Sequence, residues 1–317
     1  MDDDRQFDDG TLFPRGFDAS LQIAHGGDVL VPAGVAAGVI DRALAQRRAG
    51  LWDGFVAADD IDAGESYARA IEQFGAVADG LTEREWAAPI ATYGTVHDLV
   101  AHLSAIDIYT GKQVGLFPDQ VIGADHDHIH LGDGLIEQLQ SADYHSVLAW
   151  WRGNAREIVH AVTIDPELLG AKASWHGAPV DVRSLLVIRT FELWTHADDV
   201  RVATGRARAE PDNAQLKLMT NLAAAILPLG LELTGRPHAG RTVRLVLTGR
   251  GGGTWRRPLS ASGSVTAHDD VLLVADAIAF CRLAANRCTP VELDAYVEGD
   301  AGIAEDILQG MAALAVD

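Results

Sequence analysis

The sequence predicts an α+β fold in which a bundle of helices precedes a small α/β domain. Between residues 62 and 230, apolar residues recur at three- and four-residue spacing, which is typical of amphipathic helices. After residue 241 they alternate with polar residues, which is typical of β-strands. The polar segment "TGRPHAGR" separates the two patterns. We therefore expect three parts, an N-terminal extension over 1–60, a helical bundle over 61–235 and an α/β domain over 236–317.

The N-terminal extension has a weak pattern. Its first 30 or so residues are polar, acidic and rich in glycine, which predicts a loose arm. The segment "GVAAGVIDRALAQRRAG" (34–50) is compatible with a short helix. Nothing in this region points to a particular chemistry.

The bundle helices are predicted from apolar periodicity and from end signals. In the first, Tyr67, Ile71 and Phe74 fall on one helical face. The second begins at Thr95, which with Asp98 three residues later has the form of a capping box. We expect the five helices at about 62–79, 95–115, 143–163, 181–203 and 211–230. The segment "DHDHIHLGDG" (125–134) is predicted to be a polar loop, and "ASWHGAPV" (173–180) separates the third helix from the fourth.

The C-terminal domain is predicted to alternate strands and helices. In "TVRLVLTG" (242–249), Val243, Leu245 and Leu247 alternate with polar neighbours and should face a core. A turn and a second strand are expected in "GGGTWRRPLS". The remaining elements are a helix at about 269–285, a short strand in "VELDAYVEGD" and a final helix at about 301–314.

Composition limits the classes of partner. The formal net charge of -20 would repel phosphate backbones, so nucleic acid is an unexpected partner. Apolar runs fall short of the roughly 20 residues of a membrane helix. The acidic start "MDDDRQFDDG" is unlike a signal peptide. We expect a cytoplasmic protein with no membrane partner, either a monomer or a homodimer.

The chain has two cysteines, and their positions predict no thiol chemistry of their own. Cys281 and Cys288 are seven residues apart, and seven helical residues place two Cα atoms about 10 Å apart, too far for a disulfide. Neither lies in a CxxC motif or beside a cluster of basic residues. Both are expected to be reduced and structural, so a thiol used in a reaction would come from outside the protein.

The segment "RTFELWTHADDVRVATG" (189–205) contains the strongest candidate site. Glu192 and His196 are four residues apart on a predicted helix, so their side chains leave the same face. Such a pair can be a surface contact, a hydrogen bond or two ligands of one metal ion. His102, on the second helix, is the best candidate for a third ligand, because two helices of a bundle can direct side chains to one interior point. Asp199, three residues after His196, is placed to orient an imidazole or a bound water.

The histidines of "DHDHIHLGDG" are a weaker metal candidate. His126, His128 and His130 alternate in a polar segment, where histidines are more often solvated than bound to metal.

Two of these segments resemble a known family. "YGTVHDLVAHL" and "RTFELWTHADDVRVATG" are similar to motifs of the DinB-like metal-binding bundles, and specifically of the mycothiol-dependent maleylpyruvate isomerase group. The resemblance implies an up-down bundle in which His102, Glu192 and His196 hold a divalent ion, usually zinc. It also implies mycothiol as a low-molecular-weight thiol co-substrate.

The resemblance extends over roughly 62–317. The segment "VADAIAFCRLAANRCTPVELDAYVEGDAGIAEDIL" resembles the sterol-carrier-like domain that follows the bundle in this family, with Arg287, Val297, Gly299 and Asp300 at matching places. One position departs from the pattern, because Gly94 stands where the family usually has tryptophan. This departure puts the family's best-known substrate in doubt.

The function expected from these residues is metal-dependent activation of mycothiol for attack on an electrophilic small molecule. We expect an S-transferase of a specialised biosynthetic or detoxification pathway, with a thiol-dependent cis–trans isomerase of the maleylpyruvate type as the alternative. A metal-dependent hydrolase and a non-catalytic binding module also stay open. Arginines of the C-terminal domain, such as Arg244, Arg250 or Arg256, are candidates for binding a carboxylate or sugar of the electrophile.

Overall fold

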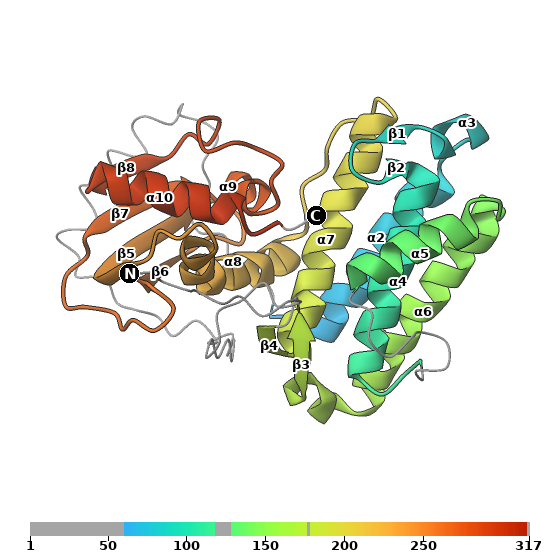
Figure 1. The fold of residues 1–317 in the computed structure, drawn as a ribbon, viewed down its shortest axis with the longest axis horizontal. Helices are drawn as coiled ribbons and strands as arrows, with labels where there is room; N and C mark the ends of the chain where they lie inside the picture. The colour runs from blue at the N-terminus through green and yellow to red at the C-terminus, as the bar shows by residue number, and fades with distance from the viewer. Residues whose placement is uncertain (1–59, 118–127, 176–177, 316–317) are drawn as a thin grey trace, which may run out of the picture. The chain divides into compact units, whose positions relative to one another are not determined.

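The computed structural model describes residues 60–117, 128–175 and 178–315, which form two compact units (Figure 1). The division falls between Glu210 and Pro211. The N-terminal extension, including the short helix expected at 34–50, lies outside the described residues.

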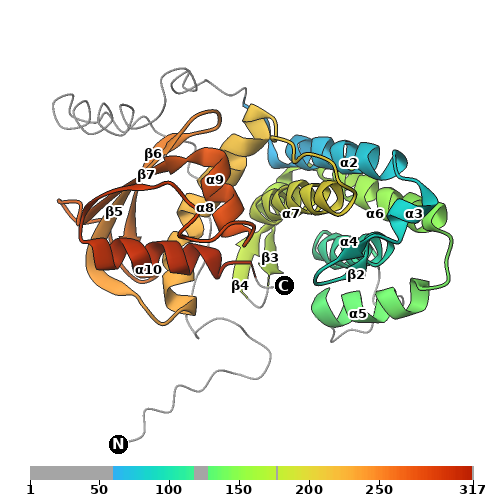
Figure 2. The same cartoon turned by 90° about the horizontal axis from the view of Figure 1, so that it is seen from above.

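The first unit is a helical bundle, as predicted. Its main helices are α2 (Ala63–Asp79), α4 (Val96–Gln113), α6 (Tyr144–Ile164) and α7 (Val182–Ala203). The helix α2 packs against α7 and α6, and α4 packs against α6 and α7 (Figure 2). Shorter elements complete the unit: α3 (Glu83–Trp86), α5 (His128–Leu139), a 3-10 helix (Pro166–Gly170), and the strand pairs β1 (Pro89–Ile90) with β2 (Gly94–Thr95) and β3 (Lys172–Trp175) with β4 (Ala178–Asp181).

Side chains at the start of each long helix accept hydrogen bonds from backbone amides that the helix itself leaves unpaired. At α4, the Thr95 hydroxyl accepts from Asp98 N and the Asp98 carboxylate accepts from Thr95 N at 3.0 Å, which confirms the predicted capping box. Asp181 caps α7 by accepting from Ser184 N at 2.7 Å. The start of each helix that carries candidate residues is therefore set by local sequence.

The bundle core is formed by apolar side chains from all four long helices. Phe74 of α2 meets Trp151 of α6 edge to face, with ring centroids 5.0 Å apart. Tyr67 and Ile71 are also fully buried, as the three- and four-residue spacing in α2 predicts.

The segment predicted as a polar loop, 125–134, is partly helical. The helix α5 begins at His128 and packs against α4. The loop prediction is therefore wrong from residue 128 onward. Alternating histidines and glycines conceal the helical period here, and packing against α4 outweighs the weak local propensity. The segment predicted as a separator after the third helix contains the two short strands β3 and β4.

The second unit is an α/β layer structure, as predicted. Its strands β5 (His238–Thr248), β6 (Gly253–Leu259), β7 (Val271–Asp276) and β8 (Tyr296–Gly299) form one sheet in the order β6-β5-β7-β8. The β5–β7 pair is parallel and the other two pairs are antiparallel. Val243, Leu245 and Leu247 are fully buried, which confirms the inward face predicted for the first strand. The helices α8 (Asn213–Leu233), α9 (Ala277–Ala284) and α10 (Ala301–Ala312) pack on the sheet (Figure 2).

The helix α8 belongs to the second unit, although the sequence boundary at 235 counted it with the bundle. It packs against α10, β6 and α9. At its crossing with α10, a Cβ atom built on Gly230 would lie 2.3 Å from the carbonyl oxygen of Gly310, so the two backbones touch. The sequence of an apolar helix between two domains does not show which of the two it packs against. This explains why the domain boundary was predicted at 235, after α8, and not before it.

The segment 269–285, predicted to be one helix, forms a strand in its first half and a helix in its second half. Residues 271–276 form β7, and α9 starts only at Ala277, with the Asp276 carboxylate accepting from Ile278 N and Ala279 N. A strand buried on both faces reads as an apolar run, and a short apolar run does not distinguish strand from helix.

One helix of the described chain, α8, is long and apolar enough to cross a membrane. Of its most apolar window, 56% is buried inside the protein, as expected for a core helix that packs on a sheet, so this is weak evidence for a membrane span.

Candidate functional site

The candidate site lies in the first unit, where α4 and α7 bring two histidines together. His102 of α4 and His196 of α7 are both buried, and their ring centroids are 6.2 Å apart. The rings are nearly perpendicular, at 83°. Two residues 94 positions apart in the sequence therefore meet, as the sequence analysis predicted from the bundle geometry.

The other two predicted site residues of α7 flank His196 along the helix. Asp199 is hydrogen-bonded to His196, with 3.0 Å between Oδ2 and Nδ1. Nδ1 of His196 donates in this arrangement, so Nε2 is the nitrogen that presents a lone pair. Glu192, one turn before His196, contacts the guanidinium of Arg189. The structure thus brings His102 and His196 together, bonds Asp199 to His196, and turns one oxygen of Glu192 toward Arg189.

Asp198 has a structural role that the sequence analysis did not predict. Its side chain is buried, accepts from Ala209 N at 2.8 Å and pairs with Arg201 at 3.2 Å. Asp198 therefore ties the segment after α7 back onto the helix.

An aromatic side chain covers both histidines. The ring of Tyr93, in the turn between β1 and β2, lies 4.4 Å from the His102 ring and 5.2 Å from the His196 ring, measured between centroids. The next residue, Gly94, has φ +93°, and a Cβ there would lie 2.8 Å from Asp98 Oδ2. A side chain at residue 94 would therefore be strained.

The helix α5 approaches His102 closely through a glycine. A Cβ built on Gly132 would lie 3.0 Å from Nδ1 of His102, which is tighter than ordinary contact. Gly132 is buried. The absence of a side chain at this residue therefore lets α5 lie against the imidazole.

A buried polar network adjoins Glu192. Arg189 Nε donates to Asp107 Oδ1 at 2.9 Å, and both side chains are 0% exposed. The Tyr67 hydroxyl donates to the same oxygen of Asp107. The Glu192 side chain is 20% exposed, so the network leads from the dry core to a carboxylate that reaches solvent.

The environment of this network perturbs two of its groups. Burial raises the pKa of Tyr67 well above its ordinary value, and the Asp107 charge raises it further. Burial alone would lower the pKa of Arg189, but the Asp107 and Glu192 carboxylates outweigh that effect and raise it. Arg189 is therefore a permanent buried cation.

Sequence reasoning missed Tyr93, Asp107 and Arg189. Arg189 was visible as part of the motif that includes Glu192 and His196, and Asp107 as an acid amid the apolar residues of "LSAIDIYT". A charged residue inside an otherwise buried helix is a signal for a buried partner. The sequence does not show which partner, because Asp107 and Arg189 are 82 residues apart.

As the side chains stand, no group of three His, Cys, Asp or Glu residues within the described ranges is close enough to hold a metal ion. The donor types around His102 and His196 are nevertheless those that zinc prefers, namely imidazole nitrogens and a carboxylate oxygen. His126 lies outside the described residues, and the side chains of His128 and His130 are not described either.

The two cysteines are free, as predicted. Cys281 is fully buried in α9, and its burial raises the pKa of the thiol. A buried, protonated thiol is a poor nucleophile.

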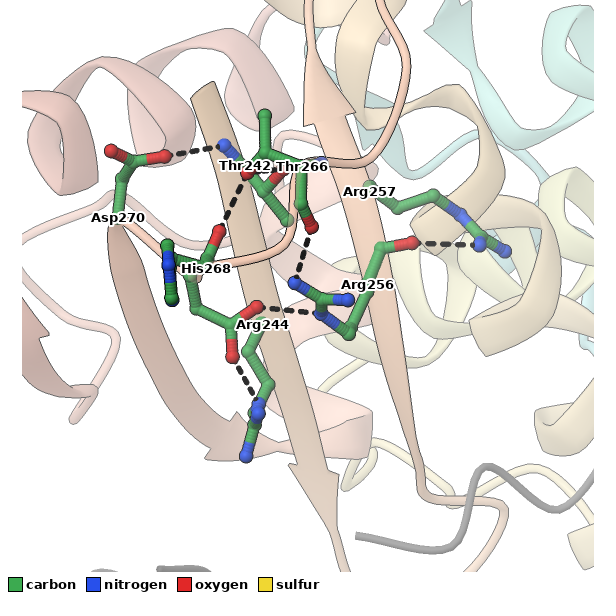
Figure 3. Close-up of polar contacts among 8 residues, drawn as sticks. Thr242, Arg244, Arg256, Arg257, Thr266, His268 and Asp270 are labelled. Atoms are coloured by element: carbon green, nitrogen blue, oxygen red, sulfur yellow. Dashed lines mark hydrogen bonds and ion pairs between the residues drawn. The ribbon is translucent and has the colours of Figure 1, made fainter. Parts of the chain in front are cut away.

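The arginines expected to bind an electrophile all lie in the second unit. Arg244 of β5 and Arg256 of β6 face each other across the strands, and each places Nε 2.6 Å from a carboxylate oxygen of Asp269. Arg256 also donates to the Thr266 carbonyl at 2.8 Å (Figure 3). Arg250 is exposed in the turn before β6. Asp269 thus offsets part of the charge of Arg244 and Arg256.

The fold and the site define a class: a helical bundle that brings two buried histidines together, followed by an α/β unit. Residues 67–201 match the family model described as the mycothiol maleylpyruvate isomerase N-terminal domain. This part of the chain, from within α2 to within α7, matches that domain family, in agreement with the resemblance. It contains His102, Glu192, His196 and Asp199.

Two solved structures share the fold over more of the chain. One is the crystal structure of the mycothiol-dependent maleylpyruvate isomerase, at 15% sequence identity and TM-score 0.52. The other is a mutant of that enzyme, at 14% identity and TM-score 0.52. Each alignment covers 74% of this chain and 91% of the other. At these identities the likeness concerns the fold alone. No curated protein matches the chain.

Proposed function

We propose that this protein is a mycothiol-dependent enzyme that isomerises a cis-alkene conjugated with carbonyl groups. The proposal rests on one observation above the others: the matched family domain contains a buried histidine pair, His102 and His196, with Asp199 bonded to the second. The comparisons favour this isomerase alternative over the S-transferase that the sequence analysis placed first.

His102, Glu192 and His196 are the residues that would hold a divalent ion, with zinc as the ion that suits two imidazoles and one carboxylate. Such an ion would activate the thiol, because a thiol bound to a divalent cation is deprotonated near neutral pH. Asp199 would keep His196 in the tautomer whose Nε2 carries the lone pair. Tyr93, whose ring lies against both imidazoles, would limit the access of water to them.

The reaction needs an external thiol, because the chain's own thiols are unsuited to it. The thiolate adds to one alkene carbon, and the alkene electron pair moves onto the conjugated carbonyl as an enolate. Rotation about the new single bond follows. Return of the electron pair then expels the thiolate and leaves the trans-alkene, with no net consumption of thiol. S-transfer uses the same nucleophile but ends in a stable thioether.

The test is a product analysis. The metal-loaded protein is incubated with maleylpyruvate, with and without mycothiol, and products are identified by chromatography and mass spectrometry. We expect trans product that forms only with mycothiol, with the thiol recovered unchanged. A thioether that accumulates in proportion to the thiol consumed would assign S-transfer, and product formation without thiol would point to hydrolysis or another class.

A matched variant tests the source of the thiol. The double change Cys281→Ser and Cys288→Ser should leave the mycothiol-dependent rate within a few-fold, since Cys281 is buried and its thiol protonated. A loss of activity in a variant that retains the wild-type circular dichroism spectrum and melting temperature would mean that a protein thiol is the nucleophile.

A further inference from the structure

Arg189 makes an unusual set of contacts for a residue that lies wholly inside the bundle. Its Nε donates to Asp107 at 2.9 Å, its Nη1 contacts Glu192, and its Nη2 lies 3.5 Å from the Leu103 carbonyl oxygen. Three sides of one planar group are therefore directed at three different acceptors. A guanidinium fixed at three points has no freedom to rotate.

Stability alone does not explain such a group. A buried ion pair usually contributes little compared with apolar side chains of the same volume, because both charges lose their hydration. Asp107 already neutralises Arg189, and the two are fully buried together. Glu192 is therefore a second carboxylate that contacts Arg189, in addition to its partner Asp107.

The contacts also link the elements that carry the candidate site. Asp107 and Leu103 belong to α4, and Leu103 directly follows His102. Arg189 and Glu192 belong to α7, about two turns and one turn before His196 respectively. Tyr67 of α2 donates to Asp107 and adds a third helix. The guanidinium thus connects the backbone beside one histidine to the carboxylate beside the other.

We propose that Tyr67, Asp107 and Arg189 form a positioning network that holds the Glu192 carboxylate in the orientation that a bound divalent ion requires. The inference rests on the proposed function, because it takes Glu192 as a ligand. None of the three network residues touches the substrate or the ion. They act through Glu192 alone.

The experiment measures metal affinity directly, by competition with a chromophoric chelator, and records the visible spectrum of the Co²⁺-loaded protein. Arg189→Lys keeps the positive charge but removes the planar fork. We expect it to weaken Zn²⁺ and Co²⁺ binding by roughly 10–100-fold, the usual loss when a group that orients a ligand is removed. The Co²⁺ spectrum should shift, because the Glu192 carboxylate is no longer held. Tyr67→Phe, which leaves Arg189 in place, should cause a smaller loss of affinity.

Two control variants separate positioning from general destabilisation. Arg152→Lys changes another arginine of the bundle that pairs between helices, with Asp79 at 2.9 Å, outside the network. Ile158→Val removes a methylene from the fully buried core. Both should retain wild-type metal affinity and the wild-type Co²⁺ spectrum, whatever their melting temperatures.

The outcomes are distinct. Wild-type metal affinity and an unchanged Co²⁺ spectrum in Arg189→Lys would overturn the positioning role while leaving the metal centre intact. An equal loss in Ile158→Val would also overturn it, because the effect would then follow stability. A wild-type protein that binds neither ion would overturn the proposed centre, and the network's role with it.

Discussion

Two acidic residues, Asp198 and Asp199, follow His196 on the same helix and form hydrogen bonds with different groups. Asp199 is bonded to the His196 imidazole, whereas Asp198, about 100° further around the helix, is bonded to the backbone of Ala209. Two adjacent acids thus serve a site and a fold respectively. Substituting the two residues one at a time therefore distinguishes an effect on metal affinity or activity from an effect on the stability of the fold.

We expect Asp199→Asn to weaken metal affinity or activity by roughly 10–100-fold, because the amide no longer accepts strongly from His196 Nδ1. Its melting temperature should stay near the wild-type value. Asp198→Asn should do the reverse, since it weakens a buried acceptor for Ala209 N and the ion pair with Arg201. Thermal unfolding and chelator competition on both variants check this. Identical profiles for the two would show that the placement of α7 against the site is wrong.

At the same scale, the shared helix face of Glu192, His196 and Asp199 could be predicted from sequence, because their spacing within one helix is fixed. Tyr93 could not, because it lies in a turn, and a turn residue has no periodic pattern that would show which side chains it meets. The partners of Arg189 could not either, since their contact depends on how α4 and α7 pack.

Among the elements, the helices with clear caps were the best predicted. Thr95 with Asp98, and Asp181 with Ser184, mark helix starts by local hydrogen bonds, and local signals are readable in sequence. The segment 269–285 was misread because the first five residues of β7 are all apolar and the strand pairs with strands on both sides. The ranges 128–139 and 213–233 were misassigned because their packing partners, α4 and the sheet, decide their structure and place.

The helix α5 yields a prediction with an internal control. A Cβ at Gly132 would lie 3.0 Å from His102 Nδ1, whereas at Gly134, on the same helix, nothing lies within 4 Å. Both glycine-to-alanine changes should favour the helix by up to about 1 kcal/mol. Gly132→Ala should displace the imidazole and lower metal affinity, and Gly134→Ala should not. Equal metal affinity in the two variants, measured by chelator competition, would mean that α5 does not constrain His102.

For the whole molecule, the two units have separate cores and separate charge networks. The bundle contains the buried ion pair of Asp107 and Arg189, and the α/β unit contains the ion pairs of Asp269 with Arg244 and Arg256. Binding of a substrate carboxylate by Arg244 or Arg250 stays a prediction. The formal net charge of -20 favours a partner recognised at such a local cationic group over a polyanion such as nucleic acid. A cytoplasmic location and a monomeric or dimeric state also stay predictions.

The most direct test is the metal content of the purified full-length chain. Elemental analysis by mass spectrometry should find about one divalent ion per chain, the stoichiometry of a single three-ligand site. His102→Ala and His196→Ala should each lose that ion, whereas the surface change Arg156→Ala, which affects an exposed pair with Glu72, should retain it. Metal-free wild-type protein with full mycothiol-dependent activity, or variants of His102 and His196 that keep the ion, would contradict the account.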